Sequence, residues 1–453
     1  MLQSGNGSDS PRPLGRTLVL PEYPSPVASS TLVYLRRIGS AGPLADAIAN
    51  HPDLAEWSVS EQQHAIDAAR GPFSAPVATH LRTRGWHVSE LILGVPSIRE
   101  AWIRENGPLP AVPGVENPDL LLALAEIRRV RPTAVLDINL TALDRTTIPL
   151  LRRDLPELKV LAGRMGTTKR YHKALHLDLS LVPCGAIAEA LRPIMRGAVE
   201  VLPHSFDPGI TTQLPPRHVI HPLLFAGALG PRYSKRHEVL MELLSATPIE
   251  VFLGLRKGVE RTSDGELVFG RDTGRSTVAA RLPIRVLAAG ARRSDRFAEP
   301  FNTNMARRSG GATRFSSRLP DPQHLFPRQC HPPVAGRAYL EVTRCAGTVV
   351  HREGDDLDGC GGALRLFEVT GVGAALLTDD SPMVRRLFEP DEEVIVYRSP
   401  EEAVKKARWL LDNPEERERI AAAGHARTLR DHTTERRVQQ LDELLRAAIE
   451  RQG

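Results

Sequence analysis

Cysteine is scarce in this sequence, and no two cysteines have the C-x-x-C spacing. The 453 residues contain only Cys184, Cys330, Cys345 and Cys360. This wide spacing argues against a disulfide framework and against a structural zinc site. We therefore expect buried or incidental thiols in a reducing cytoplasm.

Long apolar runs are absent as well. No run of about eighteen apolar residues occurs, so a membrane-spanning helix is not expected. Residues 1–16, MLQSGNGSDSPRPLGR, are polar and lack the apolar segment of a secretory signal peptide. We predict a disordered N-terminus over these residues and a cytoplasmic location for the protein.

Neither sign of charge is in large excess. The chain has 59 Lys and Arg against 54 Asp and Glu, which gives a formal net charge of +5. Many of these charges are interleaved, so a nucleic-acid partner is not predicted. A local basic patch would still suit a phosphorylated substrate.

The first half of the chain contains a series of short apolar runs separated by helical stretches. These runs are AVLDIN at 134–139, LKVLAG at 158–163, LDLSLVP at 177–183 and VEVLPH at 199–204. Such alternation predicts βαβ units, in which a parallel sheet is covered by helices on both faces. We assign residues 17–210 to a first Rossmann-like domain.

A second series begins at 223–230 and ends with EVIVY at 393–397, which predicts a second Rossmann-like domain over 211–432. The Pro-rich stretch at 207–218 is the predicted linker between the two domains. Residues 256–336 are rich in Arg, Gly, Ser and Pro and do not fit the pattern. We predict an irregular insert there and assign it no role.

The C-terminal helices carry clear start signals. At 399–402 the sequence SPEE offers an N-cap serine, a proline at the first helical position and a capping-box carboxylate. The sequence NPEE at 413–416 repeats this arrangement. In the last helix, within 433–453, one apolar stripe at helical spacing comprises Val438, Leu441, Leu444, Leu445 and Ile449.

One carboxylate stands out in LRLFEVTGVGAALLTDD at 364–380. The pattern predicts a helix followed by a buried strand, with Glu368 on the helix, in the region where open α/β sheets bind ligands. Gly359, Gly361 and Gly362 precede the helix, and their N–H groups would suit a pyrophosphate. The alternative is a glycine-rich turn beside a solvated glutamate.

Several of these segments together resemble one family of enzymes. They are AYLEV at 338–342, HREGDD at 351–356, 364–380, 387–433 and LLFAGALGPRYSKRHEVL at 223–240, with weaker matches at 163–183 and 202–208. The combination resembles GT-B glycosyltransferases, and among them the CgeB-like (spore protein YkvP/CgeB) family. The resemblance implies an α/β fold with two Rossmann-like domains facing a cleft and a C-terminal helix that crosses back to the first domain. It also implies a nucleotide-sugar donor in the second domain and an acceptor in the first.

The resemblance also implies which residues bind the donor. Glu368 would accept hydrogen bonds from the ribose hydroxyls, and the glycines and cations after residue 226 would meet the diphosphate. The full set implied is Gly227, Gly230, Arg232, Lys235, Arg236, Gly361, Gly362, Arg365, Glu368 and Gly371. One departure concerns Cys360, which stands where many retaining relatives have a first glutamate.

Two residues of the first half are candidate catalytic bases. Asp137 ends an apolar run and His204 lies in LPHSFDP beside the predicted linker. For each, the alternative is a structural role in capping a loop or bonding backbone groups.

The predicted function is transfer of a sugar from a nucleoside diphosphate to a hydroxyl of a glycan, such as a cell-surface glycan, or of a small metabolite. The expected enzyme is hexosyltransferase-like and metal-independent, and the nucleotide sugar is a co-substrate, so we expect no cofactor. The alternatives are a non-catalytic GT-B relic that binds a nucleotide sugar or a protein, and a nucleotide-sugar epimerase.

Overall fold

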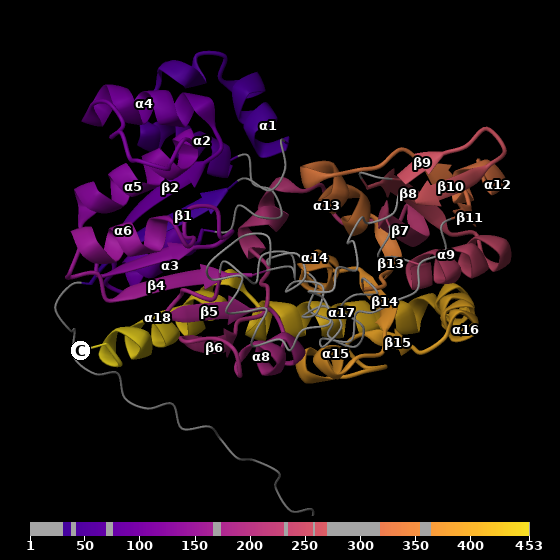
Figure 1. The fold of residues 1–453 in the computed structure, drawn as a ribbon. Helices are drawn as coiled ribbons and strands as arrows, with labels where there is room; N and C mark the ends of the chain where they lie inside the picture. Colours follow the sequence, from indigo (N-terminus) through magenta and orange to yellow (C-terminus); the bar gives the residue numbers. More distant parts are fainter. Residues whose placement is uncertain are drawn as a thin grey trace, which may run out of the picture.

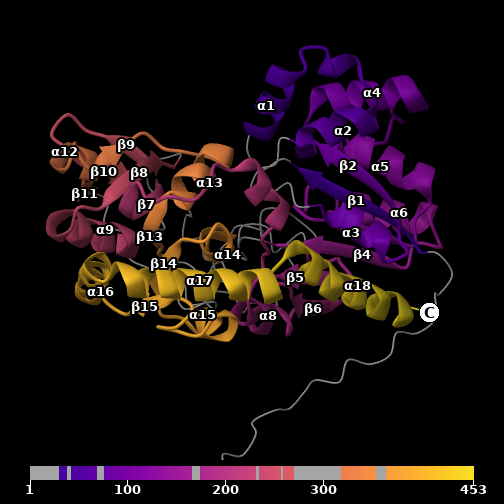
Figure 2. The ribbon, with the colours of Figure 1, turned by 180° about the vertical axis from the view of Figure 1, so that it is seen from behind.

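The protein consists of two α/β units, each built on a six-stranded sheet, which lie next to each other in the computed structural model (Figures 1 and 2). All strand pairs within these two sheets are parallel. The structure describes residues 30–37, 42–68, 76–165, 174–230, 234–256, 259–269, 318–353 and 364–452. Within them, no helix is both long enough and apolar enough to cross a membrane.

The first sheet has the strand order β2-β1-β3-β4-β5-β6. Its strands are β1 (Thr31–Arg37), β2 (His87–Leu93), β3 (Ala134–Asp137), β4 (Val160–Arg164), β5 (Leu179–Val182) and β6 (Ala198–Val201). The predicted strands β3 to β6 are confirmed. Strand β1 was not predicted, although it pairs with both β2 and β3 in the interior of the sheet.

Helices cover both faces of the first sheet, because alternate residues of each strand point to opposite sides. Val33 and Leu35 pack with the helices of one face, and Leu32 and Tyr34 with those of the other. The helices are α1 (Gly42–Asn50), α2 (Val59–Ala68), α3 (Val77–Thr83), α4 (Pro96–Asn106), α5 (Pro118–Val130), α6 (Thr147–Asp154) and α8 (Gly185–Leu191). Short turns of 3-10 helix, η1 (Leu54–Glu56) and η3 (Pro208–Gln213), complete this half.

The second sheet has the order β12-β8-β7-β13-β14-β15. Its strands are β7 (His221–Leu229), β8 (Glu250–Leu255), β12 (Cys330–His331), β13 (Ala346–Val350), β14 (Ala375–Asp379) and β15 (Ile395–Tyr397). Its helices are α9 (Ser234–Ala246), α13 (Gly336–Arg344), α14 (Leu364–Gly371), α15 (Pro382–Leu387), α16 (Pro400–Asp412) and α17 (Pro414–Asp431). The helix and strand expected in 364–380 are therefore both present.

The segment 256–336 is more regular than expected where the structure describes it. Strands β9 (Val259–Arg261), β10 (Glu266–Phe269) and β11 (Arg318–Pro320) form a small antiparallel sheet. Helix α12 (Pro322–Leu325) follows, and β12 then joins the edge of the second sheet. The prediction of an irregular insert is wrong for these parts, while residues 270–317 lie outside the described ranges.

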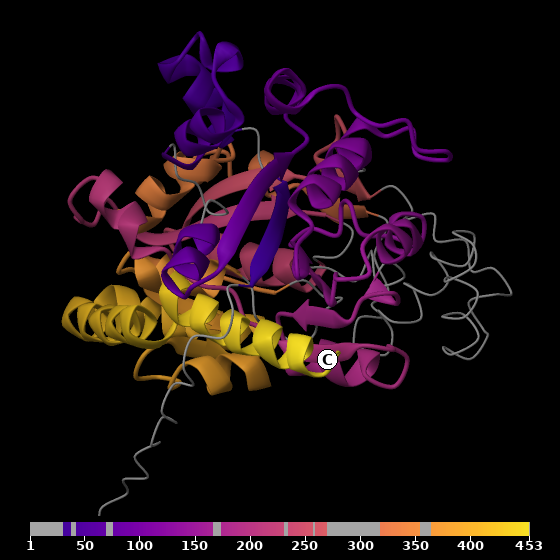
Figure 3. The ribbon, with the colours of Figure 1, turned by 90° about the vertical axis from the view of Figure 1, so that its left-hand side faces the viewer.

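The last helix, α18 (Thr434–Glu450), packs against the first sheet, as predicted (Figure 3). Val438, Leu441 and Leu445 are buried among residues of β1, β3, β4 and α3, whereas Leu444 and Ile449 are partly buried. A polar contact adds to this apolar packing, because the Trp86 indole N–H donates to Asp442 Oδ1 at 2.7 Å. The crossover helix of the GT-B fold is thus confirmed.

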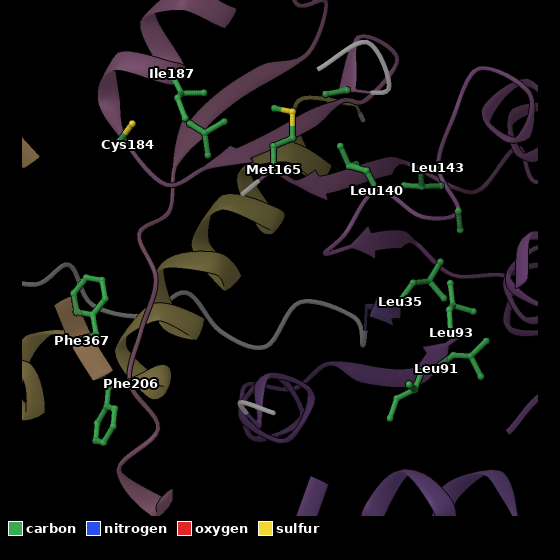
Figure 4. Close-up of a cluster of buried hydrophobic side chains, with 14 of the residues drawn as sticks. Leu35, Leu91, Leu93, Leu140, Leu143, Met165, Cys184, Ile187, Phe206 and Phe367 are labelled. Carbon is green, nitrogen blue, oxygen red and sulfur yellow. The ribbon is translucent and has the colours of Figure 1, made fainter. Parts of the chain in front are cut away.

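Phe206 lies in the connection between the two sheets. Its backbone N–H donates to His432 O at 2.9 Å, and its carbonyl oxygen accepts from the Thr434 N–H at 2.8 Å. The chain passes between the domains near Phe206 and again near His432 and Thr434, and these two connections are therefore hydrogen-bonded to each other. Phe206 also belongs to a buried apolar cluster that contains Leu35 of the first domain and Phe367 of the second (Figure 4).

The two predicted helix caps differ in outcome. Ser399 Oγ accepts from the Glu402 N–H at 3.2 Å, which confirms the N-cap serine. Glu402 Oε2 accepts from the Arg398 N–H instead of from the N–H of Ser399, so the predicted capping box is not formed. Asn413 makes no side-chain cap at α17; its Nδ2 instead donates to Trp409 O at 2.8 Å. The repeated cap is therefore wrong, because the asparagine faces back to the preceding helix.

The cysteines also differ from one another. Cys330 and Cys345 are free, buried thiols, as expected. Cys184 is disulfide-bonded, so the expectation of incidental thiols is wrong for this residue.

Candidate donor and catalytic sites

Glu368 lies in α14, the helix that leads into β14 of the second sheet. Its side chain is only 5% exposed, and its neighbours Phe367 and Val369 are fully buried. No residue of the described ranges donates a hydrogen bond to its carboxylate. Burial raises the pKa of Glu368 to about 7, although the charge of Arg365 acts in the opposite direction. The alternative of a solvated glutamate is therefore wrong.

Arg365 lies one turn before Glu368 and stacks on an aromatic ring. Its Cζ atom lies 3.8 Å from the centroid of the Tyr339 ring, which belongs to α13. This contact holds the guanidinium where its charge reaches Glu368. The structure thus brings together two of the predicted donor-binding residues.

Gly371 ends α14 and faces Phe206. A Cβ atom at this position would come within 2.4 Å of Phe206 Cγ, so the close approach of the ring requires a glycine. Packing between the domains explains why residue 371 is a glycine, and a contact with the nucleotide-sugar donor is not needed to explain it.

The predicted diphosphate loop follows β7. Gly227 lies within the strand and Gly230 directly after it, whereas Lys235 and Arg236 begin α9. Arg232 lies outside the described residues, as do Gly361 and Gly362 of the other predicted glycine loop. A glycine turn and a basic helix start therefore do meet at the carboxyl end of β7.

Arg236 connects this loop to the neighbouring strand end. Its Nη1 donates to Ala228 O at 2.9 Å and its Nε to Arg352 O at 3.0 Å. The guanidinium therefore bridges the carboxyl ends of β7 and β13, and its charge stays at the edge of the sheet where ligands bind in open α/β folds.

Sequence reasoning missed an ion pair at the same edge. Arg352 Nη1 lies 2.5 Å from Asp379 Oδ2, and Asp379 Oδ1 accepts from the Glu353 N–H at 3.0 Å. These contacts fix the segment that follows β13 against the end of β14. The motif HREGDD and the polar end of the strand were the available signals.

Asp137 has a local structural role. It is fully buried, and its carboxylate accepts from the backbone N–H groups of Asn139, Ala142 and Leu143 at 3.2, 2.7 and 3.0 Å. Burial raises its pKa, and these hydrogen bonds oppose the change. The geometry favours the loop-capping alternative over that of a catalytic base.

His204 lies after β6 and is partly buried. Burial lowers its pKa well below the ordinary value, as do the charges of Arg164 and Arg437, whereas the charge of Glu353 raises it. Glu353 follows β13 of the second sheet, so carboxyl-end segments of both sheets contribute to the surroundings of this imidazole. His204 is therefore a neutral imidazole at the junction of the two domains. Among the described residues, no group of His, Cys, Asp and Glu is arranged to hold a metal ion.

Comparisons with known proteins agree with this architecture. A family model described as glycosyl transferase-like matches residues 319–443, which include α14 and Glu368. No curated protein gives a significant match.

Two solved structures share the fold. The structure of Anabaena Alr3699/HepE in complex with UDP-glucose has a TM-score of 0.51 at 10% identity, covering 92% of this chain and 100% of that one. A glycosyltransferase from Rickettsia africae ESF-5 has a TM-score of 0.50 at 7% identity, covering 93% and 99%. The protein therefore has the GT-B fold with two Rossmann-like domains, and the CgeB-like subfamily stays a prediction.

Proposed function

We propose that the protein is a glycosyltransferase that moves a sugar from a nucleoside diphosphate to an acceptor hydroxyl. The observation that carries this proposal is Glu368, a buried carboxylate that receives no hydrogen bond from the described residues. A buried carboxylate without donors is unfavourable, and two vicinal ribose hydroxyls would satisfy both of its oxygens. The match of the surrounding segment to the glycosyl transferase-like family model supports the same role.

The diphosphate of the donor would lie at the carboxyl end of β7. Arg236 is already fixed there by the carbonyl oxygens of Ala228 in β7 and of Arg352 just after β13, so its position requires little reorganisation when a ligand binds. Lys235 begins the same helix and adds a second positive charge. Positive charge at this point would stabilise the leaving diphosphate as the glycosidic bond breaks.

The acceptor would be held by the first domain, with His204 as the proposed general base. A neutral imidazole can take the proton of the attacking hydroxyl, and His204 is neutral at physiological pH, although its lowered pKa makes it a weaker base than an ordinary histidine. We propose no catalytic role for Asp137, because backbone N–H groups occupy its carboxylate. The proposed transfer is metal-independent and takes place in the cytoplasm.

A non-catalytic role has one observation in its favour, the replacement of the first glutamate of many relatives by Cys360. A panel of nucleotide sugars tested by thermal and chemical unfolding separates the candidates. A bound donor at a hundredfold excess over its dissociation constant should add about 2.7 kcal/mol to the free energy of unfolding.

The stabilising donor is then incubated with and without an acceptor library. Nucleoside diphosphate release that requires an acceptor, and that is lost in His204→Ala, is the expected result. Stabilisation without turnover would identify the non-catalytic module, and isomerisation of the donor sugar without acceptor would identify an epimerase. Absence of stabilisation by every nucleotide sugar would contradict the proposal as a whole.

A further inference from the structure

Two arginines are held next to each other beside His204. Arg164 ends β4, and its Nη2 donates to Leu202 O at 3.2 Å. Arg437 lies in the first turn of α18, and its Nε donates to His204 O at 3.2 Å. Both guanidinium groups thus bond to the same short segment after β6, so two positive charges meet at the carboxyl edge of the first sheet.

Among the described residues, these two charges have no acidic partner. In the part of the chain that the structure describes, neither Arg164 nor Arg437 forms an ion pair. Arg437 is only 7% exposed, and its other acceptors are the neutral Gln440 Oε1 at 2.8 Å and His432 Nδ1 at 3.1 Å. The Nε atom of Arg164 is buried and has no acceptor within the described ranges.

Buried guanidinium groups are normally paired with carboxylates or with bound anions. Burial lowers the pKa of Arg164 to about 10, and burial together with the charge of Arg164 lowers that of Arg437 to about 10. Both pKa values are lowered, as expected for arginines whose charge is not balanced by a counter-ion among the described residues. Glu353 of the second domain acts on His204 but forms no ion pair with either arginine.

We propose that Arg164 and Arg437 form a subsite for the phosphate ester of an anionic acceptor. Their remaining N–H groups provide several donors in fixed planes, which suits the terminal oxygens of a phosphate. The subsite lies on the first domain beside His204, so a bound phosphate would hold an acceptor hydroxyl near the proposed base. The assignment to the acceptor rests on the proposed function.

The test uses the full-length protein and inorganic phosphate as the probe. Phosphate is titrated calorimetrically into the free protein and into protein saturated with UDP, which fills the donor diphosphate site. We expect binding in both titrations, together with competition by a hexose phosphate and none by the unphosphorylated hexose. Phosphate binding that UDP abolishes would place the anion in the donor site and overturn the proposal.

Three variants assign the binding to this cluster. Arg164→Gln should weaken phosphate binding by about ten- to a hundredfold, whereas Arg164→Lys retains the charge and should lose less. Arg128→Gln removes a charge of the same domain that is already paired with Asp154, and should leave phosphate binding unchanged. Unfolding midpoints confirm that each variant is folded.

The outcomes separate this inference from the proposed function. Equal phosphate affinity in the wild type and Arg164→Gln, or no phosphate binding to the wild type, would overturn the subsite even if UDP binds. If phosphate binding depends on Arg164 but the protein binds no nucleoside diphosphate, the anion site is retained. Its assignment to a glycosyl acceptor is then refuted.

Discussion

Phe206 and Gly371 are in direct contact across the two domains: a Cβ atom on residue 371 would lie 2.4 to 2.6 Å from three atoms of the Phe206 ring. Phe206 belongs to the interdomain connection, and Gly371 ends the helix that carries Glu368. The position of the proposed ribose-binding carboxylate is therefore coupled to the packing between the domains.

Gly371→Ala should destabilise the protein by about 1 to 3 kcal/mol, because the added methyl group would overlap the Phe206 ring. Urea unfolding measures this change. Gly185→Ala is the matched control, since a Cβ atom there meets nothing within 4 Å and the residue begins a helix. Equal stability of the two variants would show that the ring can move aside.

Leu445→Ala should destabilise the protein by about 2 to 5 kcal/mol, because this residue of α18 is fully buried against the first sheet. Leu429→Ala is the comparison, since Leu429 is 39% exposed and its loss should change stability by about 0.5 kcal/mol or less. Similar midpoints for both in urea would argue against α18 as part of the first domain's core.

Arg236→Ala should weaken binding of a nucleoside diphosphate by about ten- to a hundredfold and leave nucleoside binding nearly unchanged, because the lost contact is to phosphate. Titration calorimetry with UDP and uridine measures both. Arg419→Ala removes a charge paired with Glu416 on α17 and serves as the control. An equal loss of affinity for UDP and for uridine would show that Arg236 does not contact the diphosphate. Its role would then be limited to its hydrogen bonds to backbone carbonyls.

Parts of the fold with local signals could be predicted from sequence. The run that became β14 is short, continuous and bounded by glycine and acidic residues, and Ser399 precedes a proline and two glutamates as a cap should. Strand β1 gave a weaker signal because it contains Arg36. This arginine is buried through ion pairs with Asp67 and Glu90, which come from distant parts of the chain.

Less of the candidate site than of the fold could be predicted from the sequence. The position of Glu368 before a buried strand indicated a ligand site, but its burial depends on packing that local sequence does not show. Asp137 matched the same rule for strand ends, yet the loop that follows it saturates its carboxylate with backbone N–H groups. The proximity of Arg164 to Arg437 could not be predicted, because β4 and α18 are remote from each other in sequence.

Ionisation of Glu368 should make stability depend on pH. Its pKa is raised from 4.5 to about 7 in the folded protein, so the stabilisation is complete below about pH 4.5 and is lost as the pH rises through 7. The wild type should lose about 3 kcal/mol over this range relative to Glu368→Gln, which cannot ionise. Urea unfolding of both proteins from pH 4.5 to 8 gives the difference, and parallel stability curves would contradict a buried Glu368.

The most direct measurement of the central claim compares UDP and 2′-deoxy-UDP binding to the wild type and to Glu368→Gln at pH 8, where the carboxylate is ionised. If Glu368 binds both ribose hydroxyls, the substitution replaces one acceptor oxygen by a donor and should weaken UDP binding by about ten- to a hundredfold. The deoxy ligand should bind the wild type weakly and lose little further affinity in the variant, because its partner hydroxyl is already missing. Equal losses for the two ligands would mean that Glu368 does not bind the ribose, and would contradict the account.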